Sequence, residues 1–123
     1  MEKKDGKTYI DWSDVNEFVL NACAHFRDKN PTGVYGVPRG GLILATLLSY
    51  KLNVPLLMAP ITDCIVVDDI ADSGRTLCHF TENDTQFNKY YISTMFYMKR
   101  SIVKPDYYQF LKTDEWLVFP WEE

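Results

Sequence analysis

The sequence predicts an α/β protein with a central, mostly parallel β-sheet flanked by helices. Short apolar runs that suit buried strands alternate with segments in which apolar residues recur at helical spacing. Short turns join these segments, as in sheets whose strands are connected through helices. The 123 residues contain no repeat, low-complexity segment or linker. We therefore expect residues 1–123 to form a single domain around one core.

In the first half of the chain, the expected elements are a helix, a strand and a second helix. The first eight residues are polar and are expected to fray or to form an edge. Apolar residues then recur every three or four positions from Val15 to Phe26, which predicts a helix that Ser13 caps. A short apolar run at 33–37 predicts a buried strand, and the segment 42–52 predicts a helix that is apolar nearly all round.

The rest of the chain is expected to contain four short strands and a third helix. Pro55 weakens the first of these strands, because proline cannot donate a hydrogen bond to a sheet. Tyr, Ile, Thr and Phe residues favour the third strand, and a Pro-Asp turn signal favours a loop after it. The expected elements are strands at 54–59, 64–67, 89–98 and 116–119, a helix from 77 to about 87 and a loop at 99–108.

Composition and charge restrict the class of protein. The net charge of −4 argues against a nucleic-acid-binding surface, which needs basic patches. No apolar run is long enough to span a bilayer, and the charged first residues do not resemble a signal peptide. The three cysteines are widely spaced without a CxxC motif, so we expect reduced thiols in a cytoplasmic protein rather than disulfides or a zinc site. Neither His25 nor His79 has neighbours at metal-ligand spacing.

The stretch CIVVDDIADSGRT, residues 64–76, carries the clearest chemical pattern. A buried strand runs into two adjacent carboxylates, Asp68 and Asp69, and a loop of small residues then leads into a helix. Backbone N–H groups at such a helix start bind anions, and Gly74 lets the backbone approach them closely. Adjacent carboxylates repel each other unless a cation or hydroxyl groups satisfy them. Taken alone, the acid pair also fits a loop cap beside a solvated carboxylate.

Two further polar segments are expected at the same edge of the sheet. The loop 38–41, the loop after Asp69 and Lys99 all follow predicted strands. In parallel sheets, ligands bind at the carboxyl ends of the strands. The sequence therefore predicts one rim that binds a phosphorylated sugar, with a hard divalent ion nearby.

Residues 65–76 resemble the phosphoribosyl-diphosphate (PRPP) signature of the type I phosphoribosyltransferases. The match is an apolar run, two acids, two apolar residues and then Asp-Ser-Gly-x-Thr. The family fold, a central parallel sheet flanked by helices with a short C-terminal hood, agrees with the elements expected above. The resemblance implies that Asp68 and Asp69 bind the ribose hydroxyls and Mg²⁺, and that Asp72 is the catalytic general acid/base. By the same resemblance, the 5′-phosphate is bound by Ala71, Asp72, Ser73, Gly74, Arg75 and Thr76.

The segment 38–41, Pro-Arg-Gly-Gly, is similar to the loop that binds pyrophosphate in the purine-salvage members. It follows a predicted strand and precedes a predicted helix. In isolation, the same four residues also fit a plain strand-to-helix turn. The peptide bond at the Pro38–Arg39 position is often cis in that family. The resemblance implies that the diphosphate is bound by Pro38, Arg39, Gly40 and Gly41.

The C-terminal residues resemble the base-binding hood of the 6-oxopurine phosphoribosyltransferases, in particular the xanthine–guanine type that ends in Pro-Trp-acid. Glu122 lies where the family has an acid near the pyrophosphate and the metal. Without the resemblance, Lys99 fits a solvated lysine at a strand end and Trp116 fits a core residue. By the resemblance, the base is bound by Ile70, Lys99, Trp116 and Leu117.

Together, these resemblances imply a purine phosphoribosyltransferase, an enzyme of the glycosyltransferase class. Such an enzyme transfers the phosphoribosyl group of PRPP to guanine, xanthine or hypoxanthine, giving the nucleoside 5′-monophosphate and pyrophosphate. Mg²⁺ is then the cofactor, and PRPP and a purine base are the partners. Family members are commonly homodimers or tetramers, which we also expect here.

One departure from the family leaves a second hypothesis open. Active members carry a long mobile loop before the PRPP strand, which closes over the site and excludes water. Here only residues 60–63 separate two predicted strands, which is too short for such a lid. A catalytically weak or inactive regulator that binds PRPP or a nucleotide therefore stands beside the enzyme hypothesis. A receiver-like domain with a metal-binding acid pair fits poorly, because it leaves the phosphate loop unexplained.

Overall fold

The computed structural model describes residues 1–81 and 88–123. Its centre is a five-stranded sheet in the order β4-β3-β5-β6-β7, in which all four neighbouring pairs are parallel. The predicted α/β class with a mostly parallel central sheet is therefore confirmed. The strands of this sheet are β3 (Val34–Gly36), β4 (Leu56–Leu57), β5 (Ile65–Ala71), β6 (Tyr91–Tyr97) and β7 (Tyr107–Leu111).

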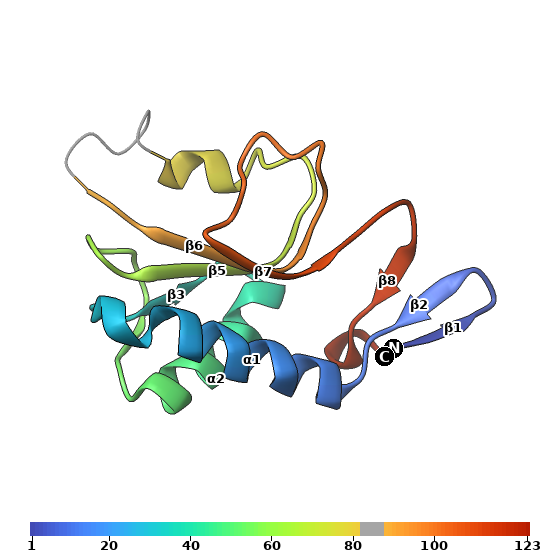
Figure 1. Cartoon of the computed structure of the whole chain (residues 1–123), viewed down its shortest axis with the longest axis horizontal. Helices are drawn as coiled ribbons and strands as arrows, with labels where there is room; N and C mark the ends of the chain where they lie inside the picture. Colours follow the sequence, from blue (N-terminus) through green and yellow to red (C-terminus); the bar gives the residue numbers. More distant parts are fainter. Residues whose placement is uncertain (82–87) are drawn as a thin grey trace.

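Helices cover one face of the sheet, and a short helix with neighbouring loops covers the other (Figure 1). On the first face lie α1 (Trp12–Phe26), which continues into the 3-10 helix η1 (Arg27–Lys29), and α2 (Gly40–Leu52). On the second face lies the 3-10 helix η2 (Leu77–Phe80). No helix among the described residues is both long and apolar enough to cross a membrane.

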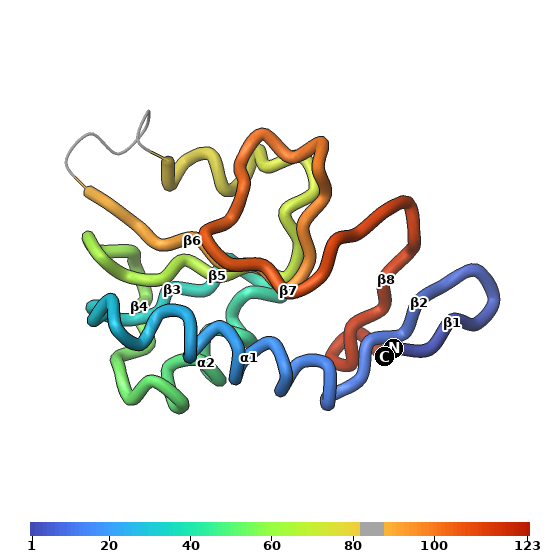
Figure 2. The backbone as a smooth tube through the Cα atoms, viewed as in Figure 1, coloured from blue at the N-terminus to red at the C-terminus, as the bar shows by residue number. Residues whose placement is uncertain are grey.

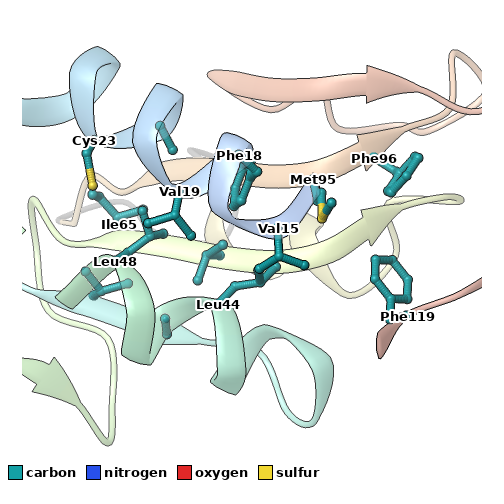
Figure 3. Packing of buried hydrophobic residues seen from close by; sticks show 14 of the residues in the cluster. Val15, Phe18, Val19, Cys23, Leu44, Leu48, Ile65, Met95, Phe96 and Phe119 are labelled. Atoms are coloured by element: carbon teal, nitrogen blue, oxygen red, sulfur yellow. The ribbon is translucent and has the colours of Figure 1, made fainter. Parts of the chain in front are cut away.

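The main core fills the space between α1, α2 and the sheet (Figure 3). Phe18 from α1 and Leu44 from α2 are fully buried and pack against apolar strand residues such as Ile65 and Met95. A second apolar cluster on the opposite face joins Val66 of β5 to Leu77 and to the loop after β6. Burial on both faces explains why the β5 run is apolar without alternation before its acid pair.

A second, three-stranded sheet lies beside the central one (Figure 1). The strands β1 (Glu2–Lys4) and β2 (Lys7–Tyr9) form a hairpin, and β2 pairs in parallel with β8 (Trp116–Val118). The predicted C-terminal strand is thus found, and the first residues form an edge rather than a frayed end. The two turn residues of the hairpin, Asp5 and Gly6, both have positive φ, as a two-residue type I′ turn requires.

The prediction that Ser13 caps the first helix is wrong. Asp11 is the N-cap: its Oδ1 accepts the amide of Asp14 at 2.9 Å, and Asp14 Oδ2 accepts the amide of Asp11 at 3.0 Å. This reciprocal pair satisfies two helix-end donors at once. The hydroxyl of Ser13 instead donates to Asp11 Oδ1 at 2.5 Å.

Several predicted element bounds also differ from the structure. The strand expected at 64–67 continues as β5 through the acid pair, because its pairing with β6 extends to Ala71. The loop expected at 99–108 ends earlier, because β7 begins at Tyr107. The strand expected at 54–59 is reduced to the two residues of β4.

The helix expected from 77 to about 87 is replaced by η2. It ends because Thr81 is extended, and both its amide and its hydroxyl bind the carbonyl of Cys78, at 3.2 and 2.7 Å. The remainder of that prediction, residues 82–87, lies outside the described residues.

Candidate active site

Three polar segments meet at one rim of the central sheet, as the sequence predicts. Because β3, β5 and β6 are parallel neighbours, their carboxyl ends lie at the same edge. Residues 38–41 follow β3, residues 72–76 follow β5, and Lys99 lies two residues after β6. The C-terminal 3-10 helix η3 (Pro120–Glu122) adds Glu122 to this region.

The segment between β4 and β5 lies at the opposite end of the sheet (Figure 2). Leu56 of β4 and Ile65 of β5 both pair with Val34, the first residue of β3. The amide of Asp63 donates to the carbonyl of Lys89, just before β6 begins. Residues 58–64 therefore turn at the amino ends of the strands. Because the rim lies at the carboxyl ends, this segment cannot cover it.

The Pro-Arg-Gly-Gly loop is pressed against β5. The peptide bond between Pro38 and Arg39 is cis. The amide of Val37 donates to the carbonyl of Val67 at 2.9 Å, and a Cβ atom on Gly41 would overlap that same carbonyl. A Cβ atom on Gly40 would overlap Asp69 Oδ2. Glycine at these two positions therefore lets the start of α2 lie directly beside Asp69.

A cleft of 660 Å³ opens beside this loop. Its charged groups are the guanidinium of Arg39 and the carboxylates of Asp69 and Glu122. Glu122 is held in place because its Oε1 accepts the amide of Phe119 at 2.9 Å. Trp121 also lines the cleft, with its ring stacked 4.9 Å from Phe119. The cleft thus brings together three residues predicted for pyrophosphate and metal binding: Arg39, Asp69 and Glu122.

Asp68 and Asp69 are destabilised as a pair of anions. Burial, followed by the charge of Asp69, raises the pKa of Asp68 to about 8. Burial also raises the pKa of Asp69, and the charge of Glu122 adds to that effect. Each carboxylate accepts the next backbone amide at 2.8 Å, which orients both but does not offset their repulsion. A bound cation or ligand hydroxyl groups would therefore stabilise the ionised pair.

These carboxylates fit a magnesium ion that takes its other ligands from a substrate. Mg²⁺ prefers oxygen ligands and is usually bound by one or two carboxylates together with phosphates and water. Among residues 1–81 and 88–123, no group of three or more His, Cys, Asp or Glu side chains is arranged to hold a metal by itself. Asp68 and Asp69, with Glu122 nearby, supply the hard oxygen donors such a shared site needs.

The loop after β5 encloses a second, smaller pocket of 110 Å³. Ser73 shapes this loop: its Oγ accepts the amide of Arg75 at 3.3 Å, and its carbonyl accepts the amide of Ile102 at 2.9 Å. Gly74 has φ of 82°, and a Cβ there would lie 2.6 Å from Ser101 Oγ. The loop is therefore braced by the segment after β6. The pocket is lined by Asp68, Ile70, Ala71, Asp72, Ser73, Gly74, Arg75, Thr76 and Leu77.

Asp72 is engaged by a residue with no predicted role. Arg100 Nε donates to Asp72 Oδ1 at 2.8 Å, and Nη2 lies 2.5 Å from the same oxygen. Arg100 is the neighbour of Lys99, so the predicted base-binding segment also reaches the predicted proton acceptor. Its position next to Lys99 is the one feature of the sequence that could have indicated a role for Arg100. The sequence does not predict its contact with Asp72.

The four predicted base-binding residues do not line a common pocket: Ile70 lines the phosphate-loop pocket and Lys99 a separate cavity. Lys99 is exposed and lines a cavity of 400 Å³ after β6 and β7. Trp116 on β8 does not line this cavity; it is 66% exposed, with Lys7 Nζ 4.8 Å from the centre of its ring. The alternative that Trp116 is a core residue is therefore wrong. Leu117 is buried beside the main core, and Ile70 packs against the same core.

Comparisons with known proteins identify solved structures that have the same fold. No protein-family model matches the chain, and no curated protein does. Among solved structures, a purine phosphoribosyltransferase from Pyrococcus horikoshii is 30% identical, with 96% of this chain and 95% of that chain covered and a TM-score of 0.81. A xanthine–guanine–hypoxanthine phosphoribosyltransferase from Helicobacter pylori is 20% identical, with 94% and 92% covered and a TM-score of 0.77.

A hypothetical protein from Neisseria gonorrhoeae, solved with bound ppGpp, has the same fold. It is 15% identical, with 99% of this chain and 92% of that chain covered and a TM-score of 0.66. The Pyrococcus protein is similar in sequence as well as in fold, over nearly the whole of both chains. This similarity shows a family relationship and not only a shared fold. This chain belongs to the purine-salvage family of type I phosphoribosyltransferases.

Proposed function

We propose that this protein transfers the phosphoribosyl group of PRPP to a 6-oxopurine base, releasing pyrophosphate and a nucleoside 5′-monophosphate. One observation carries the proposal: the acid pair stands between two recesses, the phosphate-loop pocket lined by Asp68 and the cleft lined by Asp69. PRPP has the matching order of groups, with a ribose between a 5′-phosphate and a diphosphate. Membership of the family supports the same assignment.

The residues on each side of the acid pair fit one end of PRPP. Residues 71–76 would bind the 5′-phosphate through backbone amides, hydroxyls and the Arg75 guanidinium. Arg39, together with Pro38, Gly40 and Gly41, would bind the diphosphate at the start of α2. Asp68 and Asp69 would accept hydrogen bonds from the ribose hydroxyls, and Asp68, Asp69 and Glu122 would hold Mg²⁺. When bound, Mg²⁺ neutralises charge on the leaving diphosphate.

In the proposed reaction, the bond between ribose C1′ and the diphosphate oxygen breaks. The bond between C1′ and a purine ring nitrogen forms, and the base loses a proton to Asp72. Lys99 would donate to the 6-oxo group, Trp116 would stack on the base, and Ile70 and the backbone of Leu117 would border it. Positioning and electrostatic stabilisation then supply most of the rate.

A second candidate function is regulatory binding of PRPP or a nucleotide without turnover. One observation favours it: residues 58–64 turn away from the rim, so this segment supplies no lid over the site. The Neisseria protein with bound ppGpp is a nucleotide-binding example of the fold. An open site would exclude water less well and slow the transfer.

Calorimetry and a product assay separate the two candidates. The protein is titrated with PRPP in Mg²⁺ buffer and then incubated with PRPP and each of guanine, xanthine and hypoxanthine. Formation of a nucleoside monophosphate and pyrophosphate in equal amounts supports the enzyme. PRPP binding without consumption of any base supports the regulator, and absence of PRPP binding contradicts both.

We further propose that the protein self-associates in the cytoplasm. Exposed apolar side chains occur on α2 and on the segment that follows β4, including Tyr50, Met58 and Ile61. Such side chains are common in subunit interfaces. All three cysteines are free, in keeping with a reducing compartment. Light scattering coupled to gel filtration tests the assembly, since a monomer at micromolar concentration contradicts it.

A further inference from the structure

Thr94, in the middle of β6, has a buried hydroxyl without a partner. The residue is 0% exposed, and Oγ1 is the buried side-chain polar atom that makes no hydrogen bond among the described residues. Its neighbour Ser93 is equally buried, but the Ser93 hydroxyl donates to the carbonyl of Tyr107 at 3.0 Å. An unpaired buried hydroxyl destabilises a fold, so valine would be the more stable choice at position 94.

The strand register identifies the residues that lie beside Thr94 on the two neighbouring strands. Thr94 pairs with Asp68 on β5 and with Tyr108 on β7. Side chains of paired residues on neighbouring strands project from the same face of the sheet, and the strands are about 4.8 Å apart. That face carries the phosphate-loop pocket, which Asp68 lines. The register therefore places the Thr94 side chain beside the Asp68 side chain on this face of the sheet.

Asp68 has room for such a donor. Its Oδ1 accepts the amide of Asp69 at 2.8 Å, and a carboxylate accepts several hydrogen bonds through its two oxygens. A carboxylate that binds ribose hydroxyls must keep a fixed orientation, and a second donor from the neighbouring strand provides one.

We propose that Thr94 is a positioning residue: its hydroxyl donates to the Asp68 carboxylate when PRPP is bound and fixes that carboxylate against the ribose hydroxyls. This inference rests on the proposed function, because it assigns Asp68 to the ribose. The hydroxyl is unpaired in the free protein and gains its partner in the complex. Thr94 thus costs stability in the free state and contributes affinity in the bound state.

The test compares stability and PRPP affinity in three variants. Thr94→Val keeps the shape of the side chain and removes the hydroxyl, so we expect a higher thermal unfolding midpoint and PRPP binding weakened by about tenfold. Thr94→Ser keeps the hydroxyl and should bind PRPP within about twofold of the original protein. Ser93→Ala removes a hydroxyl that is already paired, so it should lower the unfolding midpoint without changing PRPP affinity.

Affinities are measured by calorimetry in Mg²⁺ buffer, and unfolding midpoints are measured without ligand. The inference is overturned if Thr94→Val binds PRPP as tightly as the original protein, or if Thr94→Ser is weakened as much as Thr94→Val. A role for Tyr108 as the partner instead predicts unchanged PRPP affinity in Thr94→Val, and so also overturns it. If the original protein fails to bind PRPP at all, the proposed function fails and this inference fails with it.

Discussion

Arg100 and Asp72 form an ion pair at the rim of the site, with both guanidinium contacts made to the same carboxylate oxygen, Oδ1. Asp72 Oδ2 is therefore not held by this guanidinium. Both side chains are substantially exposed, so the pair contributes little to folding stability. The pair instead orients the Asp72 carboxylate, which is proposed to accept the proton. Arg100, the neighbour of Lys99, provides this orientation.

Asp72→Asn should lower kcat by roughly tenfold or more, because an amide has the same shape but cannot accept the proton of the base. The PRPP dissociation constant should stay unchanged, since the backbone of the phosphate loop is preserved. Steady-state kinetics and calorimetry measure the two quantities. Unchanged turnover would remove Asp72 from the mechanism.

Arg100→Gln should lower kcat by about tenfold with PRPP affinity unchanged, because the carboxylate of Asp72 loses its fixed orientation. Added to Asp72→Asn, the same change should have little further effect, since the two residues act as a unit. Arg27→Gln, at an exposed arginine on η1, is the matched control and should leave kcat unaltered. A higher kcat in Arg100→Gln would show instead that the ion pair competes with the base.

Gly40→Ala should weaken pyrophosphate binding by about tenfold or more, because the new Cβ overlaps Asp69 Oδ2 and displaces the start of α2. Gly33→Ala is the matched control at the other end of the sheet. Its Cβ would lie 2.8 Å from Leu57 Cγ, so it should lose stability but keep pyrophosphate affinity. Calorimetry with pyrophosphate and Mg²⁺ compares them. Equal losses of affinity would contradict a local role for Gly40.

The raised pKa of Asp68, about 8, makes the stability of the ligand-free protein depend on pH. An unfolded Asp titrates near pH 4, so between about pH 4 and 8 the folded chain holds a proton that the unfolded chain has released. The free energy of unfolding should therefore fall as pH rises through this range. Asp68→Asn should flatten that dependence in part, because the pKa of Asp69 is also raised. Urea unfolding at several pH values in a metal chelator tests this, and an unaltered slope in the variant would contradict it.

Trp116→Ala should weaken binding of the base by about tenfold, because base–aromatic stacking contributes on the order of 1–3 kcal/mol. Trp116→Phe should retain most of the affinity. Since Trp116 is exposed, neither change should alter the unfolding midpoint much. The measurement is KM for the base at saturating PRPP. A large fall in the midpoint with unchanged KM would assign the indole to packing rather than to the base.

Local patterns in the sequence predict much of the rim, because strand ends and glycine loops are local features. The acid pair, the phosphate loop and the Pro-Arg-Gly-Gly loop all lie at the carboxyl ends of strands, as the order of strands and turns along the chain predicts. The hairpin at the N-terminus also has a local signal, Asp5-Gly6 between short polar strands, although polarity alone suggests a frayed end. The C-terminal end of η2 depends on the hydrogen bonds from Thr81 to the carbonyl of Cys78. The spacing of apolar residues does not predict these bonds.

Other features depend on contacts between distant segments and leave no local trace. The Arg100–Asp72 pair joins residues 28 positions apart. The length of β5 is fixed by its pairing with β6, so the acid pair lies within a strand rather than after one. Trp116 is exposed because β8 pairs with β2 in the small sheet instead of joining the core.

The most direct test of the proposed activity is a stoichiometric product assay with PRPP, Mg²⁺ and a mixture of guanine, xanthine and hypoxanthine. The proposed function predicts that one nucleoside monophosphate and one pyrophosphate form for each base consumed, and that Asp72→Asn slows both equally. PRPP that binds but is never transferred, or products that form at the same rate in Asp72→Asn, would contradict it.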